Sequence, residues 1–99
     1  MKHDCHLFFE ILGTKLKMDI IENLRVTPLS VNELTRRCNE ERSKVSHALL
    51  SLLQCGFVMA RKDGKKRLYS LNKETLVPLL DLADMHIRKY CAVCRKHKN

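Results

Sequence analysis

The sequence has no tryptophan, only five aromatic residues and no long hydrophobic run. Its apolar stretches fall well short of the roughly 20 residues that a membrane-spanning helix needs, and no secretory signal is visible. We therefore expect a soluble, cytoplasmic protein with no membrane partner. Neither a repeat nor a long linker divides the 99 residues, of which 44% are hydrophobic. A single domain over residues 1–99, with one small core, is expected.

The chain also lacks the residue sets that indicate a disulfide framework or a catalytic centre. Its five cysteines are odd in number and no export signal accompanies them, which argues against structural disulfides. No serine–histidine–aspartate set and no carboxylate pair stands in a recognisable catalytic context, and a chain this small has little room for a deep cleft. We expect that the protein is not an enzyme.

Positive charge is abundant and unevenly distributed. Nineteen lysines and arginines against eleven acids give a net charge of +8. Residues 61–67 hold five bases and one acid, and residues 85–99 hold five bases and no acid, whereas residues 1–29 hold four of each. This balance favours a polyanionic partner such as nucleic acid. Two separate basic zones indicate two local functions.

Residues 30–56 have the pattern of two short helices joined by a tight turn. Ser30 and Glu33 have the spacing of a capping box, so a helix is predicted to start here, and Asn39 suits the left-handed conformation that ends one. A second helix is expected to open at the two glutamates that follow. Its predicted buried positions are Val45, Ala48, Leu49, Leu52 and Leu53. This is the layout of a helix-turn-helix motif.

A basic hairpin is predicted directly after this motif, over residues 57–71. Two short runs typical of strands, residues 57–60 and 67–71, flank a segment that contains Asp63-Gly64, a strong signal for a tight turn. A basic hairpin in this position is the wing of a winged helix.

Three further helices are predicted outside the motif. The first ends at Gly13, the second starts at Thr14, and the last starts near Thr75 and runs into a Cys/His-containing tail over residues 75–99. The first and last helices carry apolar stripes that one small domain cannot both cover, so we expect a homodimer through these two helices. The expected fold is mainly α: a winged helix-turn-helix with five helices and a wing.

The second motif helix keeps its polar side chains opposite its apolar face. As a recognition helix it is expected to enter the major groove of double-stranded DNA, where Arg and Lys donors reach phosphate or guanine. The wing is expected along the backbone or in the minor groove. The predicted DNA-binding residues are Arg42, Ser43, Lys44, Ser46, His47, Arg61, Lys62, Lys65, Lys66 and Arg67. A two-fold dimer is expected to bind an inverted repeat with half-sites about 34–36 Å apart.

Three of the five cysteines, Cys5, Cys91 and Cys94, lie near the two chain ends with histidines beside them. Cys91, Cys94 and His97 have the spacing that lets two thiolates and one imidazole converge. If the first and last helices pack together, Cys5 or His6, from the same chain or from its partner, is a candidate for the remaining ligand. These five residues are the candidate metal ligands. Zinc suits a sulfur-and-nitrogen set and a softer ion such as Cu(I) suits sulfur alone. The alternatives are a redox pair, a zinc that only holds the dimer together, or an inactive tail.

The other two cysteines, Cys38 and Cys55, fall on helical positions that look buried. We interpret them as small core residues.

The motif residues together resemble the winged-helix repressors of the arsenical-repressor (ArsR-like) family. The matching residues are Ser30-Val31-Asn32-Glu33-Leu34, Lys44-Val45-Ser46-His47, Leu49, Leu52, Gly56-Phe57-Val58, Asp63-Gly64 and Tyr69-Ser70-Leu71. Phe8-Phe9, Leu12-Gly13 and the Cys-rich tail look like small archaeal members. The resemblance implies a homodimeric repressor that metal ions or thiol oxidation release from DNA.

The metal sites of this family do not carry over cleanly. Ser30 and Asn32 stand where the family's arsenic and cadmium site has cysteines. Asp84, His86 and His97 match the spacing of part of a family zinc site, but not its place directly after the wing or its last acid, so we interpret the match as coincidence. The prediction is a sequence-specific, dimeric repressor. The alternative is a winged-helix module that binds protein or RNA, with a purely structural zinc or no metal.

Overall fold

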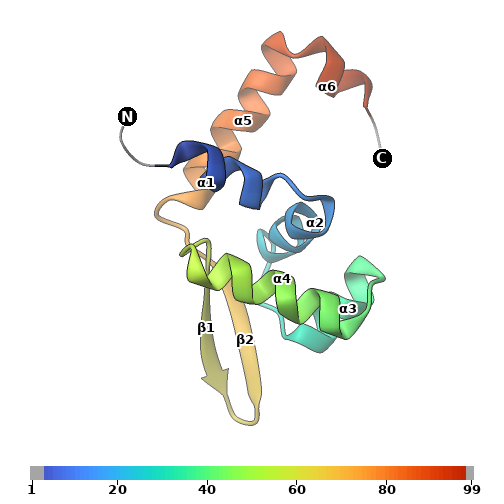
Figure 1. The fold of residues 1–99 in the computed structure, drawn as a ribbon, viewed down its shortest axis with the longest axis vertical. Coiled ribbons are helices and arrows are strands. Elements are labelled where there is room, and N and C mark those ends of the chain that lie inside the picture. Colours follow the sequence, from blue (N-terminus) through green and yellow to red (C-terminus); the bar gives the residue numbers. More distant parts are fainter. Residues whose placement is uncertain (1–3, 98–99) are drawn as a thin grey trace.

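The computed structural model describes residues 4–97, which form helices around one two-stranded antiparallel sheet (Figure 1). The elements in chain order are α1 (Cys5–Leu12), α2 (Lys15–Leu24), α3 (Val31–Cys38), α4 (Arg42–Gln54), β1 (Val58–Asp63), β2 (Lys66–Leu71), α5 (Leu76–Tyr90) and α6 (Ala92–Lys96). This order confirms the predicted winged helix-turn-helix. No helix within this part of the chain is long and apolar enough to span a lipid bilayer.

Side-chain caps start the first two helices where the sequence predicts them. The Asp4 carboxylate accepts the Leu7 N–H at 2.9 Å, and the Thr14 hydroxyl accepts the Lys17 N–H at 3.3 Å. Each cap satisfies a backbone donor that the first turn of a helix leaves free. Helix α1 ends before Gly13. The part of the predicted first helix before residue 4 lies outside the described residues.

The helix-turn-helix forms through the predicted local interactions. The Ser30 hydroxyl accepts the Glu33 N–H at 3.3 Å, and the Glu33 carboxylate accepts the Ser30 N–H at 2.9 Å, which completes the capping box that starts α3. Asn39 ends this helix with a φ of 52°. Helix α4 begins at Arg42, slightly later than predicted, and Glu41 at its N-cap makes no side-chain hydrogen bond to it.

One hydrophobic core holds the motif together. Helix α4 packs against α2, α3 and β1. The buried apolar residues are Leu12, Ile20, Ile21, Leu24, Leu29, Leu34, Val45, Ala48, Leu49, Leu52, Phe57, Val58, Tyr69, Leu71, Leu76 and Leu80. Four of the five positions predicted to face inward from the second motif helix are fully buried, and Leu53 is half-buried. The opposite face of α4 is therefore free for other contacts.

The wing lies where the sequence predicts it, but its two strands are longer than predicted, and it is joined to the body by hydrogen bonds at its base. Strands β1 and β2 pair in register from Val58 with Leu71 to Asp63 with Lys66. Gly64, with a φ of +65°, supplies the left-handed conformation that the turn between them needs. At the base, Tyr69 and Leu29 exchange two backbone hydrogen bonds of 2.8 and 3.1 Å.

The end of the chain differs from the prediction, because the last helix breaks in two and gives six helices in residues 4–97 instead of five. Cys91 has non-helical dihedral angles of −98° and 87° and ends α5. The Arg95 guanidinium then donates to the carbonyl oxygens of Ile87 and Arg88, at 3.3 and 2.8 Å. The Arg88 carbonyl is one that a helix end leaves without a backbone partner, whereas the Ile87 carbonyl also accepts the Cys91 N–H at 3.3 Å. Arg95 therefore stabilises the break, beyond which α6 turns back from the end of α5 (Figure 1).

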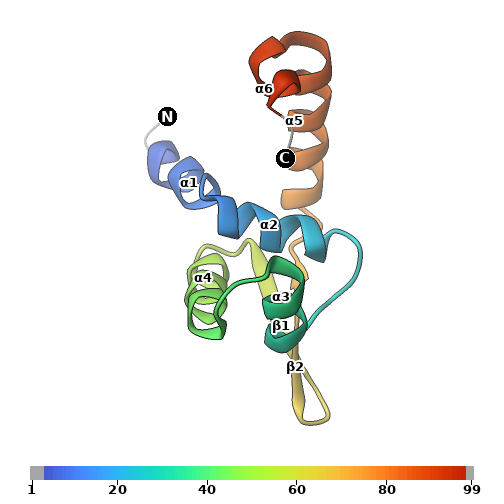
Figure 2. The ribbon, with the colours of Figure 1, turned by 90° about the vertical axis from the view of Figure 1, so that its right-hand side faces the viewer.

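Helices α1 and α5 project from the helix-turn-helix body (Figure 2), and both carry exposed apolar side chains. Phe8 anchors α1 by an edge contact with Phe57, with ring centroids 5.0 Å apart. The exposed large apolar residues on α1, α5 and α6 are Leu7, Phe8, Phe9, Leu82, Tyr90 and Val93. This is the uncovered surface that the sequence indicates for the first and last helices.

Candidate nucleic-acid interface

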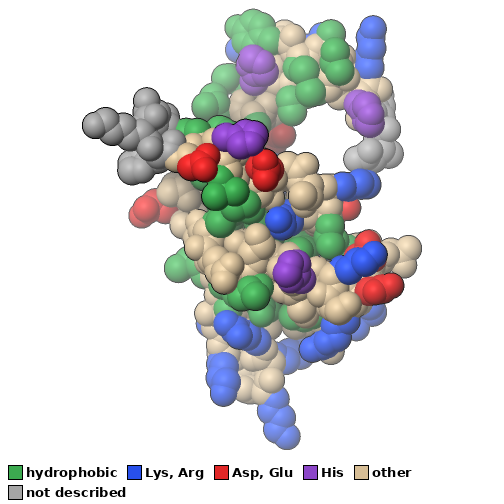
Figure 3. Space-filling model, in the orientation of Figure 1, with side chains coloured by type: hydrophobic (Ala, Val, Ile, Leu, Met, Phe, Trp, Pro, Cys, Tyr) green, Lys and Arg blue, Asp and Glu red, His purple; other side chains and the backbone are tan. Residues whose placement is uncertain are grey.

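The structure places the predicted recognition residues together on the solvent-facing side of α4. Arg42, Ser43, Lys44, Ser46 and His47 are all exposed, while the other face of α4 is in the core. Lysine and arginine side chains lie over this face and over the wing (Figure 3). The helix therefore presents donors at the surface on a rigid, packed element. Their contact with DNA stays a prediction.

Two cations of this helix already have partners within the protein. The Arg42 guanidinium donates to the side-chain oxygen of Asn32, at the start of α3. The Lys44 ammonium lies 3.7 Å from the Glu40 carboxylate, with both side chains partly open to solvent. The first contact orients Arg42. The second is a weak surface pair that a phosphate can replace.

The five basic wing residues are all exposed, but they do not face one surface. Lys65, Lys66 and Arg67 border a hollow shared with α3, and the Arg67 guanidinium lies over the Tyr69 ring at 5.6 Å. Arg61 instead lines a separate hollow that it shares with the loop before α3. The structure thus separates Arg61 from Lys65, Lys66 and Arg67. Lys62, which pairs with Arg67 across the two strands, is exposed but lines neither hollow.

The hollow between α3 and the wing is a basic site that the sequence did not reveal as a unit. It has a volume of about 390 Å³, and its cations are Arg36, Arg42, Lys65, Lys66 and Arg67. Its one carboxylate belongs to Glu33, whose pKa is lowered by the hydrogen bonds from Ser30. Arg36 and Asn32 are not among the residues that the sequence predicts to contact DNA. These two residues join the wing cations because α3 packs beside the wing, and this arrangement cannot be read from the sequence alone.

The candidate metal ligands are only partly brought together. Cys91 and Cys94 are neighbours: the Cys91 Sγ accepts the Cys94 N–H at 3.4 Å. The start of α1, with Cys5 and His6, lies apart from α6 in both ribbon views (Figures 1 and 2), and the His6 imidazole lies 3.1 Å from the Glu10 carboxylate. Within residues 4–97 of one chain, no three His, Cys, Asp or Glu side chains form a metal-binding group.

The thiols of this pair have different acidities. Hydrogen bonds from the Cys94 thiol and from the Cys94 N–H lower the pKa of Cys91, whereas the same contact with the Cys91 side chain raises the pKa of Cys94. Cys91 is therefore the thiol that ionises first, so at neutral pH it carries more of the reactive thiolate than Cys94.

The two cysteines assigned to the core behave differently from each other. Cys38 is half-buried against the core, and burial raises the pKa of its thiol. Cys55 is exposed, so the prediction that it is buried is wrong. It lies just past the last residue of α4, at a C-cap whose side chain no longer follows the buried face of the helix.

Comparison with known proteins finds relatives among regulators of transcription. Over 77 residues the chain is 35% identical to the HTH-type transcriptional regulator NmtR of Mycobacterium tuberculosis, a match covering 78% of this chain and 64% of NmtR. Over 76 residues it is 29% identical to a "probable mercury resistance operon repressor" of Streptomyces lividans, covering 77% and 61%. The chain spans about three fifths of the length of these curated relatives. No protein-family model matches it.

Solved structures share the fold. The crystal structure of Rv0081 of M. tuberculosis matches with a TM-score of 0.80 and 30% identity over 85% of each chain. Mb0332 of Mycobacterium bovis, a homodimeric winged helix-turn-helix DNA-binding domain and possible ArsR-family regulator, matches with a TM-score of 0.77 and 19% identity, covering 91% and 81%. The chain belongs to the ArsR-like family of winged helix-turn-helix transcriptional regulators.

Proposed function

We propose that this protein is a homodimeric, cytoplasmic repressor that binds an inverted-repeat operator in double-stranded DNA. The observation that carries the proposal is the α4 face from Arg42 to His47, whose donors are exposed on a helix fixed by the core. A helix of this kind fits the major groove and can read base edges. The net charge of +8 favours the same polyanionic partner.

The hollow between α3 and the wing supplies the second contact of this proposal. A DNA phosphate fits there because five cations surround the hollow and its one carboxylate is engaged by Ser30. Phosphate contacts fix the register of a protein on the duplex, while base contacts select the sequence. On this account α4 selects the site and the hollow holds the strand beside it.

Dimerisation through α1, α5 and α6 is supported by their exposed apolar side chains. Phe9, Leu82, Tyr90 and Val93 are between 58% and 76% exposed in one chain. A contact between two copies buries these side chains and arranges the two α4 helices by a two-fold axis. An inverted repeat is the DNA sequence with that symmetry.

The effector site is proposed at Cys91 and Cys94. The two thiols are hydrogen-bonded neighbours at the end of α5, the helix assigned to the dimer contact. Zinc or another thiophilic ion fits this pair, with His97 and with Cys5 or His6 of the partner chain as further ligands. Oxidation of the pair to a disulfide is the alternative. Among the relatives, the named mercury resistance repressor gives independent support for a thiophilic ion.

The experiment that tests the function is selection of binding sites from random duplex DNA by the reduced protein. We expect enrichment of an inverted repeat with half-site centres one helical turn apart, and affinity that falls steeply with salt. Repeating the titration with zinc and with oxidant tests the effector. Enrichment of no sequence, together with capture of a protein or RNA, would instead support an interaction module.

A further inference from the structure

We propose that Arg25 is a positioning residue: it fixes the angle of α5 against α2 and thereby sets the separation of the two α4 helices in the dimer. The inference rests on the proposed function, because it assumes that α5 forms the dimer contact and α4 reads DNA. It assigns Arg25 a role without any contact to the nucleic acid.

Helix α5 needs such a restraint because the core holds only its beginning. Leu76 and Leu80 are buried, but Leu82, two residues past this anchored part, is 59% exposed. From there the helix stands away from the body (Figure 2). Two buried leucines within the first turns fix a hinge point well, but they leave the direction of a 15-residue helix weakly determined.

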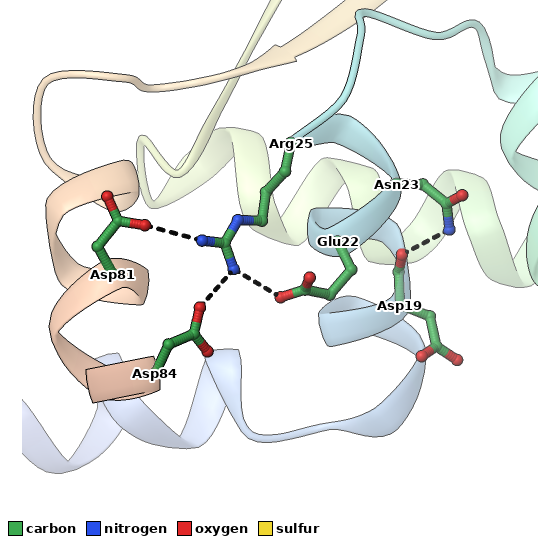
Figure 4. A network of polar contacts seen from close by, with 6 residues as sticks. All are labelled: Asp19, Glu22, Asn23, Arg25, Asp81 and Asp84. Carbon is green, nitrogen blue, oxygen red and sulfur yellow. Dashed lines mark hydrogen bonds and ion pairs between the residues drawn. The ribbon is translucent and has the colours of Figure 1, made fainter. Parts of the chain in front are cut away.

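Arg25 contacts α5 just beyond this hinge point. One guanidinium nitrogen lies 2.9 Å from the Asp81 carboxylate, and the other lies 3.2 Å from Asp84. Figure 4 shows the guanidinium between the two helices, with these carboxylates on one side and Glu22 of α2 on the other. Asp81 and Asp84 are three residues apart and so share one face of α5. A planar guanidinium can bond both at once, which fixes a direction as well as a distance.

Within the described residues, this is the only ion-pair contact that joins segments far apart in the sequence. The other ion pairs between residues 4 and 97 join side chains three or four positions apart, whereas Arg25 joins positions 56 and 59 residues away. The Arg25 side chain is only 23% exposed, so most of it lies against the protein, although both carboxylates that it bonds are more than half exposed.

Core packing connects Arg25 to the recognition helix α4. Arg25 stands at the C-cap of α2, and α2 packs against both α3 and α4. A change in the angle between α5 and α2 is therefore a change between the dimer helix and the recognition helix. In a two-fold dimer this change occurs twice. Because DNA half-sites are about 34–36 Å apart, even a small rotation misaligns one helix when the other is seated.

The test compares spacer preference among variants, using duplexes with the selected half-sites and spacers changed by one or two base pairs. For Arg25→Ala we expect roughly three- to tenfold weaker binding at the preferred spacing, a flatter dependence on spacer length, and unchanged affinity for a single half-site. Asp81→Ala with Asp84→Ala, which removes both acceptors on α5, should reproduce this result. Both aspartates are more than half exposed, so their replacement spares the core. Arg25→Lys keeps the positive charge but cannot bond both carboxylates through one planar group, so its loss of affinity and its spacer dependence should be intermediate.

The matched control is Glu22→Ala, which removes the partner of Arg25 on its own helix and leaves the bonds to α5. We expect the spacer profile of the unchanged protein. An unaltered profile in both Arg25→Ala and the double aspartate variant would overturn this inference alone. Absence of sequence-selective binding by the unchanged protein would overturn the proposed function and this inference together.

Discussion

The Arg42 guanidinium and the Asn32 side-chain oxygen are hydrogen-bonded across the turn of the helix-turn-helix, from the start of α4 to the start of α3. Both residues also line the hollow between α3 and the wing. Asn32 therefore holds a cation at the edge of the proposed phosphate site before DNA arrives. A side chain that is already oriented loses less conformational entropy on binding.

This contact predicts coupling between the two residues. Asn32→Ala should weaken operator binding by about 1 kcal/mol, because Arg42 loses its orientation. In an Arg42→Ala background the same change should have little further effect. A double-mutant cycle of anisotropy titrations measures the coupling. Additive losses would show that Asn32 contacts DNA on its own account.

The wing and the recognition helix should differ in how they affect binding. Lys65→Ala with Lys66→Ala should weaken binding to all duplexes and reduce the slope of log affinity against log salt by roughly two units, since two phosphate contacts are lost. Ser46→Ala or His47→Ala should change the order of preferred sequences at a nearly constant slope. Titrations at several salt concentrations separate these cases. An unchanged slope in the lysine variant would exclude the wing from the phosphate contacts.

The two neighbouring thiols should react unequally. The lowered pKa of Cys91 gives it more thiolate at neutral pH than Cys94, so iodoacetamide should label Cys91 first. Its advantage should shrink as the pH rises and Cys94 also ionises. Cys38 should react slowly because burial raises the pKa of its thiol. Peptide mapping by mass spectrometry over a pH series measures this order, and equal rates for Cys91 and Cys94 would contradict it.

The same pair should control any response to metal or oxidant. Cys91→Ser with Cys94→Ser should remove bound thiophilic metal and abolish the effect of zinc or oxidant on DNA affinity. Cys55→Ser is the control, since its thiol is also exposed but lies at the end of α4. Elemental analysis and DNA titrations provide the measurements. A response that survives the double substitution would place the effector site elsewhere.

The dimer contact should be sensitive to charge on α1 and α5. Phe9→Glu or Tyr90→Glu should yield monomers at micromolar concentration, because each buries a charge in the proposed contact and neither is needed in the core, being 58% and 71% exposed. Val26→Glu, at an 80% exposed position outside these helices, should remain dimeric. Sedimentation velocity gives the result. If Phe9→Glu and Tyr90→Glu both remain dimeric, the dimer contact lies elsewhere on the molecule.

The features that sequence predicted well depend on neighbours along the chain. The capping box of Ser30 and Glu33, the left-handed Asn39 and the turn at Gly64 each follow from chemistry within a few residues. The inward positions of α4 follow from helical periodicity in the same way. These local signals agree with one another, and together they determine the helix-turn-helix and its wing.

The features that sequence missed depend on the packing of distant segments. The hydrogen bonds from Arg25 to Asp81 and from Arg42 to Asn32 join residues that are 56 and 10 positions apart, and no periodic pattern in the sequence indicates them. The break at Cys91 was hidden because the residues around it favour a helix, while Arg95 stabilises the end of α5 from the following turn. Cys55 was misplaced because helical periodicity was extended one residue past the helix.

The central claim is that two copies of α4, held at a fixed separation, read one duplex. It is tested most directly by titrating the unchanged, reduced protein against the selected inverted repeat and against a duplex of equal composition with one half-site scrambled. The account predicts two chains per intact duplex and a preference of roughly a thousandfold or more. Equal affinity for the two duplexes, or one chain per intact duplex, would contradict it.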